Sequence, residues 1–273
     1  MKAPIYFFLF FSYTINAQFI AGKILEANSK IPLPYVNIGV LNQGIGTVSD
    51  QNGEFYLELN PATINDTLRF SMVGFTRKDF IVKDYLTQEK TEQIILLEES
   101  VTSLEEVVLV RKKDKKYKQK ILGNKTESKF ITGGFTSNNL GNEIGFITRI
   151  RKSPTFVESF NISIAKNTYG PVKFRLNFYD LKDGLPNKNI LEEMIIIETD
   201  IKTGIVSVDL TPYDIVVEDD FVVAIEWVED LGIGNLLFSA GFFGSNLFAR
   251  VASQGQWERI GVAAIGMNVG VTY

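Results

Sequence analysis

The chain has 273 residues, with 28 Lys+Arg against 32 Asp+Glu and a formal net charge of −4. At about 150 residues per domain this length indicates two modest domains, and the balanced charge argues against a nucleic-acid partner. The sequence contains no Cys and no His. These two absences exclude disulfides, Cys/His zinc sites and Ser-His-Asp triads, and they indicate a protein that is not an enzyme.

Residues 1–17 have the order of a signal peptide. Lys2 precedes an apolar run from Ile5 to Phe11, and the small Ala17 follows a more polar stretch. This order predicts export and cleavage after Ala17, with an N-terminal core strand as the alternative. We expect a periplasmic, outer-membrane-associated or secreted protein, and because no Cys follows the apolar run we do not expect a lipoprotein.

Short alternating segments bounded by turn residues fill the next part of the chain, residues 18–99. They predict strands at 19–24, 35–40, 54–59 and 66–72. The run from Asp50 to Gly53 predicts a tight turn before a strand that buries Phe55, Leu57 and Leu59. A calcium loop is the weaker interpretation, because Leu59 stands where such a loop has its closing Glu.

Four sequence blocks in this region carry a family resemblance: GKI at 22–24, PLPYVNI at 32–38, GTVSDQNGEF at 46–55 and DTLRFSMVGF at 66–75. In this order they resemble the carboxypeptidase regulatory-like domain over about residues 19–97. The resemblance implies a seven-stranded, transthyretin-like β-sandwich, a non-catalytic module common in exported proteins of Bacteroidota. A zinc-peptidase domain cannot follow it, because the chain has no His.

Residues 96–98 and 104–110 resemble the join between this module and the plug of TonB-dependent glycan receptors. Only 163 residues (273 − 110) follow Val110, too few for a plug and a large barrel. We therefore read Glu105 and Glu106 as exposed strand residues. A structural or assembly component associated with a TonB-dependent outer-membrane system is one alternative function.

A basic linker is expected at residues 100–129. Residues 111–129 hold nine basic and two acidic side chains and few apolar ones. Such a run is usually solvated. Its charge also allows peripheral association with an anionic outer-membrane surface.

Residues 130–273 predict a second β-sandwich that loosely resembles jelly-roll accessory domains. Strands are expected at 160–165, 173–179, 204–210 and 221–227, and the last is apolar enough for a central strand. The alternating residues 265–273, which end in Tyr273, leave the last strand of an outer-membrane barrel as the weaker alternative. The predicted fold class is all-β, with two sandwiches.

Five residues of the second sandwich have the types that bind a glycan or an envelope protein: Arg175, Tyr179, Glu226, Trp227 and Trp257. Glu226 is notable because a carboxylate inside an apolar strand must be paired or solvated. An ion pair with Arg175 or Arg250 is the structural alternative for Glu226, and a place in the core is the alternative for the two Trp residues.

Two further possibilities concern the acidic side chains of this sandwich. Asp180 and Asp183 flank a loop that could hold a structural calcium ion, and no other cofactor is expected. A carboxylate pair containing Glu226 could hydrolyse a glycoside, although no activating group is visible. The features together favour an exported, non-enzymatic cell-envelope protein with a spacer or docking sandwich and a binding sandwich.

Overall fold

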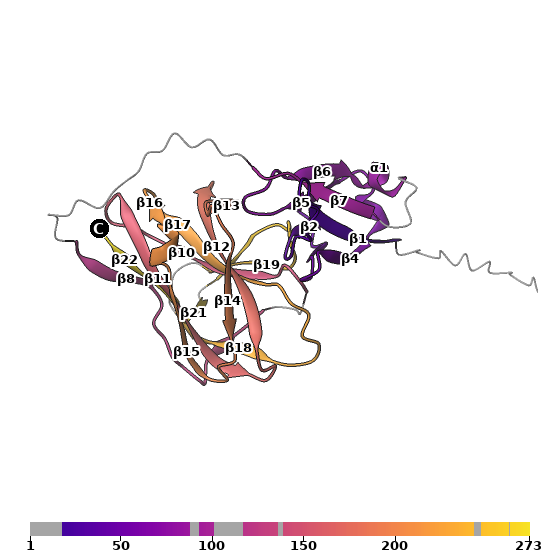
Figure 1. The fold of residues 1–273 in the computed structure, drawn as a ribbon. Helices are drawn as coiled ribbons and strands as arrows, with labels where there is room; N and C mark the ends of the chain where they lie inside the picture. Colours follow the sequence, from indigo (N-terminus) through magenta and orange to yellow (C-terminus); the bar gives the residue numbers. More distant parts are fainter. Residues whose placement is uncertain (1–17, 88–92, 101–116, 136–138, 243–246, 262) are drawn as a thin grey trace, which may run out of the picture.

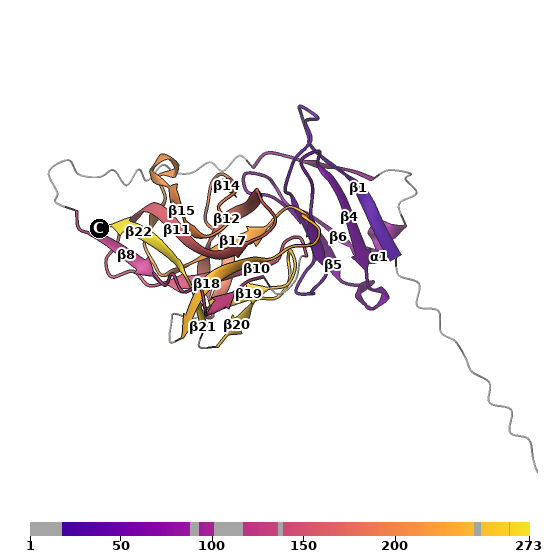
Figure 2. The same ribbon diagram turned by 90° about the horizontal axis from the view of Figure 1, so that it is seen from below.

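The structure is a computed structural model that describes residues 18–87, 93–100, 117–135, 139–242, 247–261 and 263–273. It contains two β-sandwiches that lie side by side (Figures 1 and 2). The predicted signal peptide at residues 1–17 and most of the predicted basic linker lie outside the described residues. In the described part of the chain, no helix is both long and apolar enough to cross a membrane.

Within the described residues, the N-terminal sandwich has seven strands in two sheets, as the family resemblance implies. One sheet has the order β4-β1-β7 and the other has the order β3-β2-β5-β6. The elements are β1 (Gln18–Glu26), β2 (Asn37–Val40), β3 (Gly46–Val48), β4 (Glu54–Leu59), β5 (Thr67–Ser71), β6 (Lys78–Ile81) and β7 (Gln93–Leu97), with the short helices η1 (Pro61–Thr63) and α1 (Val82–Leu86).

The predicted turn before β4 is confirmed in detail. The carboxylate of Asp50 accepts hydrogen bonds from the backbone N–H groups of Asn52 and Glu54, each 2.8 Å long, and Gly53 has a positive φ of 74°. Strand β4 then alternates between exposed and buried side chains, so that Phe55, Leu57 and Leu59 enter the core as predicted.

In the part of the C-terminal sandwich that the structure describes, a seven-stranded sheet packs against an eight-stranded sheet. The first sheet contains β10 (Glu143–Thr148), β12 (Val172–Lys182), β13 (Leu185–Asn189), β14 (Ile195–Thr199), β17 (Phe221–Trp227), β19 (Leu247–Arg250) and β20 (Glu258–Ile260). The second contains β8 (Gln119–Gly123), β9 (Thr132–Gly133), β11 (Thr155–Asn167), β15 (Gly204–Asp209), β16 (Val216–Val217), β18 (Leu236–Phe242), β21 (Ala263–Ile265) and β22 (Met267–Thr272), and η2 (Thr211–Tyr213) follows β15.

Aromatic side chains fill the space between these two sheets, among them Phe160, Phe174, Phe221 and Phe238, each at most 1% exposed. Strand β17 lies in the middle of the seven-stranded sheet, between β12 and β10, and all seven of its residues are buried. The prediction of a central strand at 221–227 is therefore confirmed, and so is the all-β fold.

The predicted domain boundary needs one correction. Strand β8 pairs with the last strand, β22, from Gln119↔Thr272 to Gly123↔Asn268, and Figure 1 shows β8 beside the C-terminus. Residues 119–123 therefore belong to the C-terminal sandwich rather than to the predicted linker at 100–129. The basic composition concealed this strand because only Ile121 and Leu122 in it are large and apolar.

Candidate functional site

Four charged residues form a row across the outer face of the seven-stranded sheet, the face turned away from the main core. Each is the cross-strand partner of the next: Arg175 of β12, Glu226 of β17, Glu143 of β10 and Arg250 of β19. We call these four residues the charge row. Its two carboxylates lie in the middle and its two guanidinium groups lie at the ends.

The charge row is buried and paired. Nη2 of Arg175 lies 2.7 Å from Oε2 of Glu226, and Nη2 of Arg250 lies 2.7 Å from Oε1 of Glu143. Both carboxylate side chains have no exposed surface. Paired and hydrogen-bonded charges are the form in which carboxylates tolerate such burial.

Two polar side chains on β12 hold the carboxylates together. Asn177 donates through Nδ2 to Oε1 of Glu143 at 2.9 Å and to Oε2 of Glu226 at 2.8 Å. The hydroxyl of Tyr179 donates to Oε1 of Glu143 at 3.0 Å. Residues two positions apart in a strand share a face, so Arg175, Asn177 and Tyr179 all meet the row.

The surroundings shift the pKa values of the two carboxyl groups, Glu143 and Glu226, in opposite directions. Burial, with a smaller contribution from the charge of Glu226, raises the pKa of Glu143 from 4.5 to about 8 against the opposing effect of Arg250. Burial would also raise the pKa of Glu226, but Arg175 and Arg250 outweigh it and hold that pKa below the usual range. The proton therefore belongs to Glu143 and the negative charge to Glu226.

A protonated and an ionised carboxyl group side by side are the parts of an acid/base pair. In this protein neither of them reaches the surface. A general acid or base must come within hydrogen-bond reach of the group it serves. The arrangement links β12, β17, β10 and β19 through hydrogen bonds and an ion pair buried inside the sheet.

The predicted site residues divide between two faces of the sheet. Arg175, Tyr179 and Glu226 come together in and beside the charge row, and the ring of Trp257 lies over the guanidinium of Arg250, 4.8 Å from ring centroid to Cζ. Trp227 lies on the opposite face, in the main core. The structural alternative of a pair between Glu226 and Arg175 is confirmed, whereas ligand binding by these residues stays a prediction.

The two residues predicted to hold calcium serve the β12–β13 turn. Asp180 accepts a hydrogen bond from the backbone N–H of Lys188 at 2.6 Å, and Asp183 occupies a left-handed position with φ of 53°. The described residues contain no group of three or more acidic side chains placed to hold a metal ion. Calcium binding therefore stays a prediction.

Arg175 also connects the two sandwiches. Its guanidinium donates to the backbone carbonyl of Tyr35 and to Oδ1 of Asn37, both in the N-terminal sandwich. A second polar contact centres on Glu229, which accepts from Lys173 at 3.0 Å and from the hydroxyl of Tyr35 at 3.3 Å. We call this contact region between the sandwiches the junction.

The backbones of the two sandwiches also come into close contact at the junction. Gly39 of β2 and Gly46 of β3 are cross-strand partners, and a Cβ at either position would lie 2.2 Å from the carbonyl oxygen of Ser253. The neighbouring Gln254 donates through Nε2 to the hydroxyl of Ser71 at 2.8 Å. The outer face of the β3-β2-β5-β6 sheet thus fits directly against the segment after β19.

Apolar side chains from both sandwiches complete the junction. Tyr35 and Val48 from the N-terminal sandwich form a buried cluster with Val228 from the C-terminal sandwich. Three partly buried side chains of the C-terminal sandwich pack against them, namely Leu140, Met194 and Ile196. Because the junction combines buried charge, close backbone contact and apolar packing, it favours one fixed arrangement of the sandwiches.

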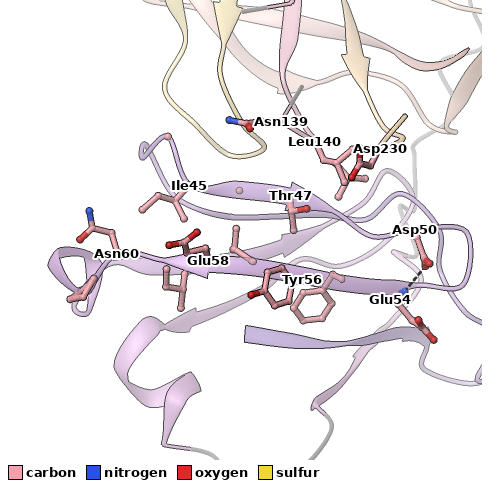
Figure 3. A pocket seen from close by; sticks show the side chains of 17 residues that line it. Ile45, Thr47, Asp50, Glu54, Tyr56, Glu58, Asn60, Asn139, Leu140 and Asp230 are labelled. Atoms are coloured by element: carbon pink, nitrogen blue, oxygen red, sulfur yellow. Dashed lines mark hydrogen bonds between the residues drawn. The ribbon is translucent and has the colours of Figure 1, made fainter. Parts of the chain in front are cut away.

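Beside the junction, strands β3 and β4 and two loops of the C-terminal sandwich surround a groove of about 1010 Å³. Figure 3 shows the groove between β3 and β4, with Asn139, Leu140 and Asp230 at its rim. We call it the interdomain groove. It is lined by residues 44–48, 50, 54–61, 139, 140 and 230.

Sequence reasoning missed Glu143 and the interdomain groove. Glu226 drew attention because it is a carboxylate inside an otherwise apolar strand. Glu143 meets the same criterion, since it begins a strand of mostly apolar residues at 143–148. The groove depends on the contact of two sandwiches whose junction residues lie more than 130 positions apart, such as Tyr35 and Arg175. No local pattern carries that information.

The fold defines a two-domain, all-β protein built of sandwiches. Residues 20–109 match the family model of the CarboxypepD_reg-like domain. The N-terminal sandwich is therefore a CarboxypepD_reg-like domain, which confirms the resemblance expected over residues 19–97. The match fits a non-catalytic β-sandwich domain. No curated protein matches the chain.

Proposed function

We propose that this chain is an exported, non-catalytic binding protein of the cell envelope in which the CarboxypepD_reg-like domain and the C-terminal sandwich act as one rigid unit. The observation that carries this proposal is the double use of Arg175. Its guanidinium pairs with Glu226 inside the C-terminal sandwich and also donates to Tyr35 and Asn37 of the N-terminal sandwich.

A rigid unit suits a binding role better than a tethered spacer does. When two domains are held in a fixed orientation, a ligand that touches both of them does not have to order them first. The interdomain groove is such a place, since its lining comes from both sandwiches. The non-catalytic role is supported by the burial of the acid/base-like pair of Glu143 and Glu226.

A protease cut between the sandwiches tests this proposal. A specific protease site is placed within residues 101–116, the protein is cleaved, and the products are separated by size-exclusion chromatography. We expect the two halves to elute together from the wild-type junction and to separate when Arg175→Gln weakens it. Separation of the wild-type halves at micromolar concentration would contradict the rigid unit.

A second candidate function is glycan binding, and one specific observation favours it. Phe19 and Tyr56, on the outer face of the β4-β1-β7 sheet, are 50% and 60% exposed, and their rings stack with centroids 5.3 Å apart. Exposed aromatic faces stack on the apolar faces of sugars. A glycan array with the whole protein tests this role, and Tyr56→Ala should abolish any signal that depends on the stack.

A further inference from the structure

The N-terminal sandwich has an open side. Strand β4 is at the end of its sheet and pairs with β1, and strand β3 is at the end of the other sheet and pairs with β2. Within the described residues, neither strand has a partner strand on its other side. Unpaired strand edges offer rows of N–H and C=O groups to an incoming extended chain.

The interdomain groove runs along these two edges. Figure 3 shows Glu54 and Asp50 at one end, close to the turn, and Asn60 and Ile45 at the other end. The groove thus follows the whole six-residue length of β4. The groove's volume of about 1010 Å³ is enough for a short extended segment.

The charge of the groove restricts its occupant. Asp50, Glu54, Glu58 and Asp230 line it, and its described lining contains no Lys or Arg. Lys23, from β1, pairs with Glu54 at 3.3 Å in an exposed position, so it offsets only part of this charge. An occupant with positive charge is favoured, and an acidic one is repelled.

We propose that the interdomain groove binds an extended basic segment of a protein partner, which adds to the free edge of β4 as a further strand. Side chains alternate along a strand, and on β4 the residues Glu54, Tyr56 and Glu58 share the exposed face. The docked segment therefore has a basic residue opposite Glu54 and another opposite Glu58, four positions apart. Cross-strand pairs of opposite charge stabilise this register.

The side chains of the docked strand that point inward meet the apolar lining of the groove. Ile45 and Leu57 line it from the N-terminal sandwich, and Leu140 lines it from the C-terminal sandwich. Small branched side chains between the basic positions fit this lining. The ligand class is thus a segment with the pattern basic, branched, any residue, branched, basic.

Three labelled heptapeptides test the proposal with the full chain by fluorescence anisotropy. The first, Thr-Lys-Val-Thr-Val-Lys-Thr, has the expected pattern. The second replaces both Lys residues by Glu, which reverses its charge. The third replaces both Val residues by Pro, which keeps the charge but removes two backbone donors and blocks strand pairing.

We expect the first peptide to bind at least about tenfold more tightly than either control, and more weakly as salt is added. Amide hydrogen exchange in residues 54–59 should slow when it binds. The double variant Glu54→Lys/Glu58→Lys should lose about tenfold or more in affinity. The double variant Glu192→Lys/Glu193→Lys makes the same change of charge at exposed positions outside the groove and should leave the affinity unchanged.

Several results would overturn the proposal. These are no binding of the first peptide, equal binding of the Pro peptide, or equal loss of affinity in the Glu192→Lys/Glu193→Lys protein. Binding of oligosaccharides in the groove, with no binding of the peptide, would also overturn it in favour of a glycan. The rigid unit is tested separately, by cleavage and size-exclusion chromatography. Failure of the peptide to bind would therefore overturn the groove proposal but not the rigid unit.

Discussion

Arg175 and Glu226 are cross-strand partners on β12 and β17, and their side chains form an ion pair of 2.7 Å that is closed to solvent. The same guanidinium reaches the backbone carbonyl of Tyr35 across the junction. One side chain thus balances charge within the C-terminal sandwich and attaches the N-terminal sandwich to it. Removal of this side chain should affect both the stability of the protein and the association of its domains.

The first prediction concerns Arg175→Gln. The variant leaves the charge of Glu226 buried without its main partner, and breaking a buried pair in this way costs about 3–5 kcal/mol. Urea unfolding of the full chain measures the loss. The matched control is Arg77→Gln. Arg77 is exposed, and its Nε lies 3.9 Å from Oδ2 of Asp79, so this substitution removes a long surface ion pair instead of a buried one. We expect the control to change the free energy of unfolding by less than about 0.5 kcal/mol.

The second prediction concerns pH. The pKa of Glu143 is raised from 4.5 to about 8 by burial. Between pH 4.5 and about 8, Glu143 therefore keeps its proton in the folded protein but loses it in the unfolded chain. Since the folded state then binds more protons, this site's contribution to stability is present below pH 4.5 and is lost as the pH rises to about 8.

Glu143→Gln tests the sign of this effect. The amide does not titrate, and its oxygen can still accept from Asn177 and Arg250, whose donors lie 2.9 and 2.7 Å away in the wild type. Urea unfolding at several pH values should show a flatter profile for the variant between pH 5 and 8 than for the wild type. Superimposable profiles would mean that Glu143 is ionised when folded, contrary to this account.

The third prediction concerns the close backbone contact at the junction. In Gly39→Ala the new Cβ would lie 2.2 Å from the carbonyl oxygen of Ser253, so the sandwiches must move apart. We expect a loss of about 1–3 kcal/mol and earlier separation of the halves after cleavage. Gly261→Ala is the control, because none of the residues that the structure describes has an atom within 4 Å of a Cβ at that position. Equal behaviour of the two variants would argue against the contact.

The fourth prediction concerns export. If residues 1–17 are a signal peptide, the protein recovered from outside the cytoplasm begins at Gln18 and has 256 residues (273 − 17). Intact-mass measurement after expression with the native N-terminus gives the result directly. A chain that keeps Met1 and stays in the cytoplasm would remove the envelope location from the proposed function.

The sequence predicted those features that depend on neighbouring residues. The Asp50–Gly53 turn, the buried face of β4 and the central position of β17 all follow from local pattern, and the structure confirms each. Glu226 drew attention because a carboxylate in an apolar strand needs a partner. Its ion pair with Arg175, 51 positions away, is one of the two pairs that the sequence allows for it.

The features that the sequence did not predict depend on contacts between distant segments. Trp227 and Glu226 are adjacent in β17, and the pleat directs their side chains to opposite faces of the sheet, Trp227 into the main core and Glu226 into the charge row. The junction brings Tyr35 beside Arg175, and neither residue has an unusual local sequence. The free edges of β3 and β4 become visible only once the order of strands in each sheet is known.

The most direct test of the rigid unit is the measurement of residual dipolar couplings for backbone amides in both sandwiches of the full-length protein. If the two sandwiches form one rigid unit, one alignment tensor fits the couplings from residues 18–87 and 139–242 together. In Arg175→Gln, the two sets should require tensors of different magnitude. If the wild-type sandwiches already require different tensors, they move independently, and the central claim of one rigid unit is contradicted.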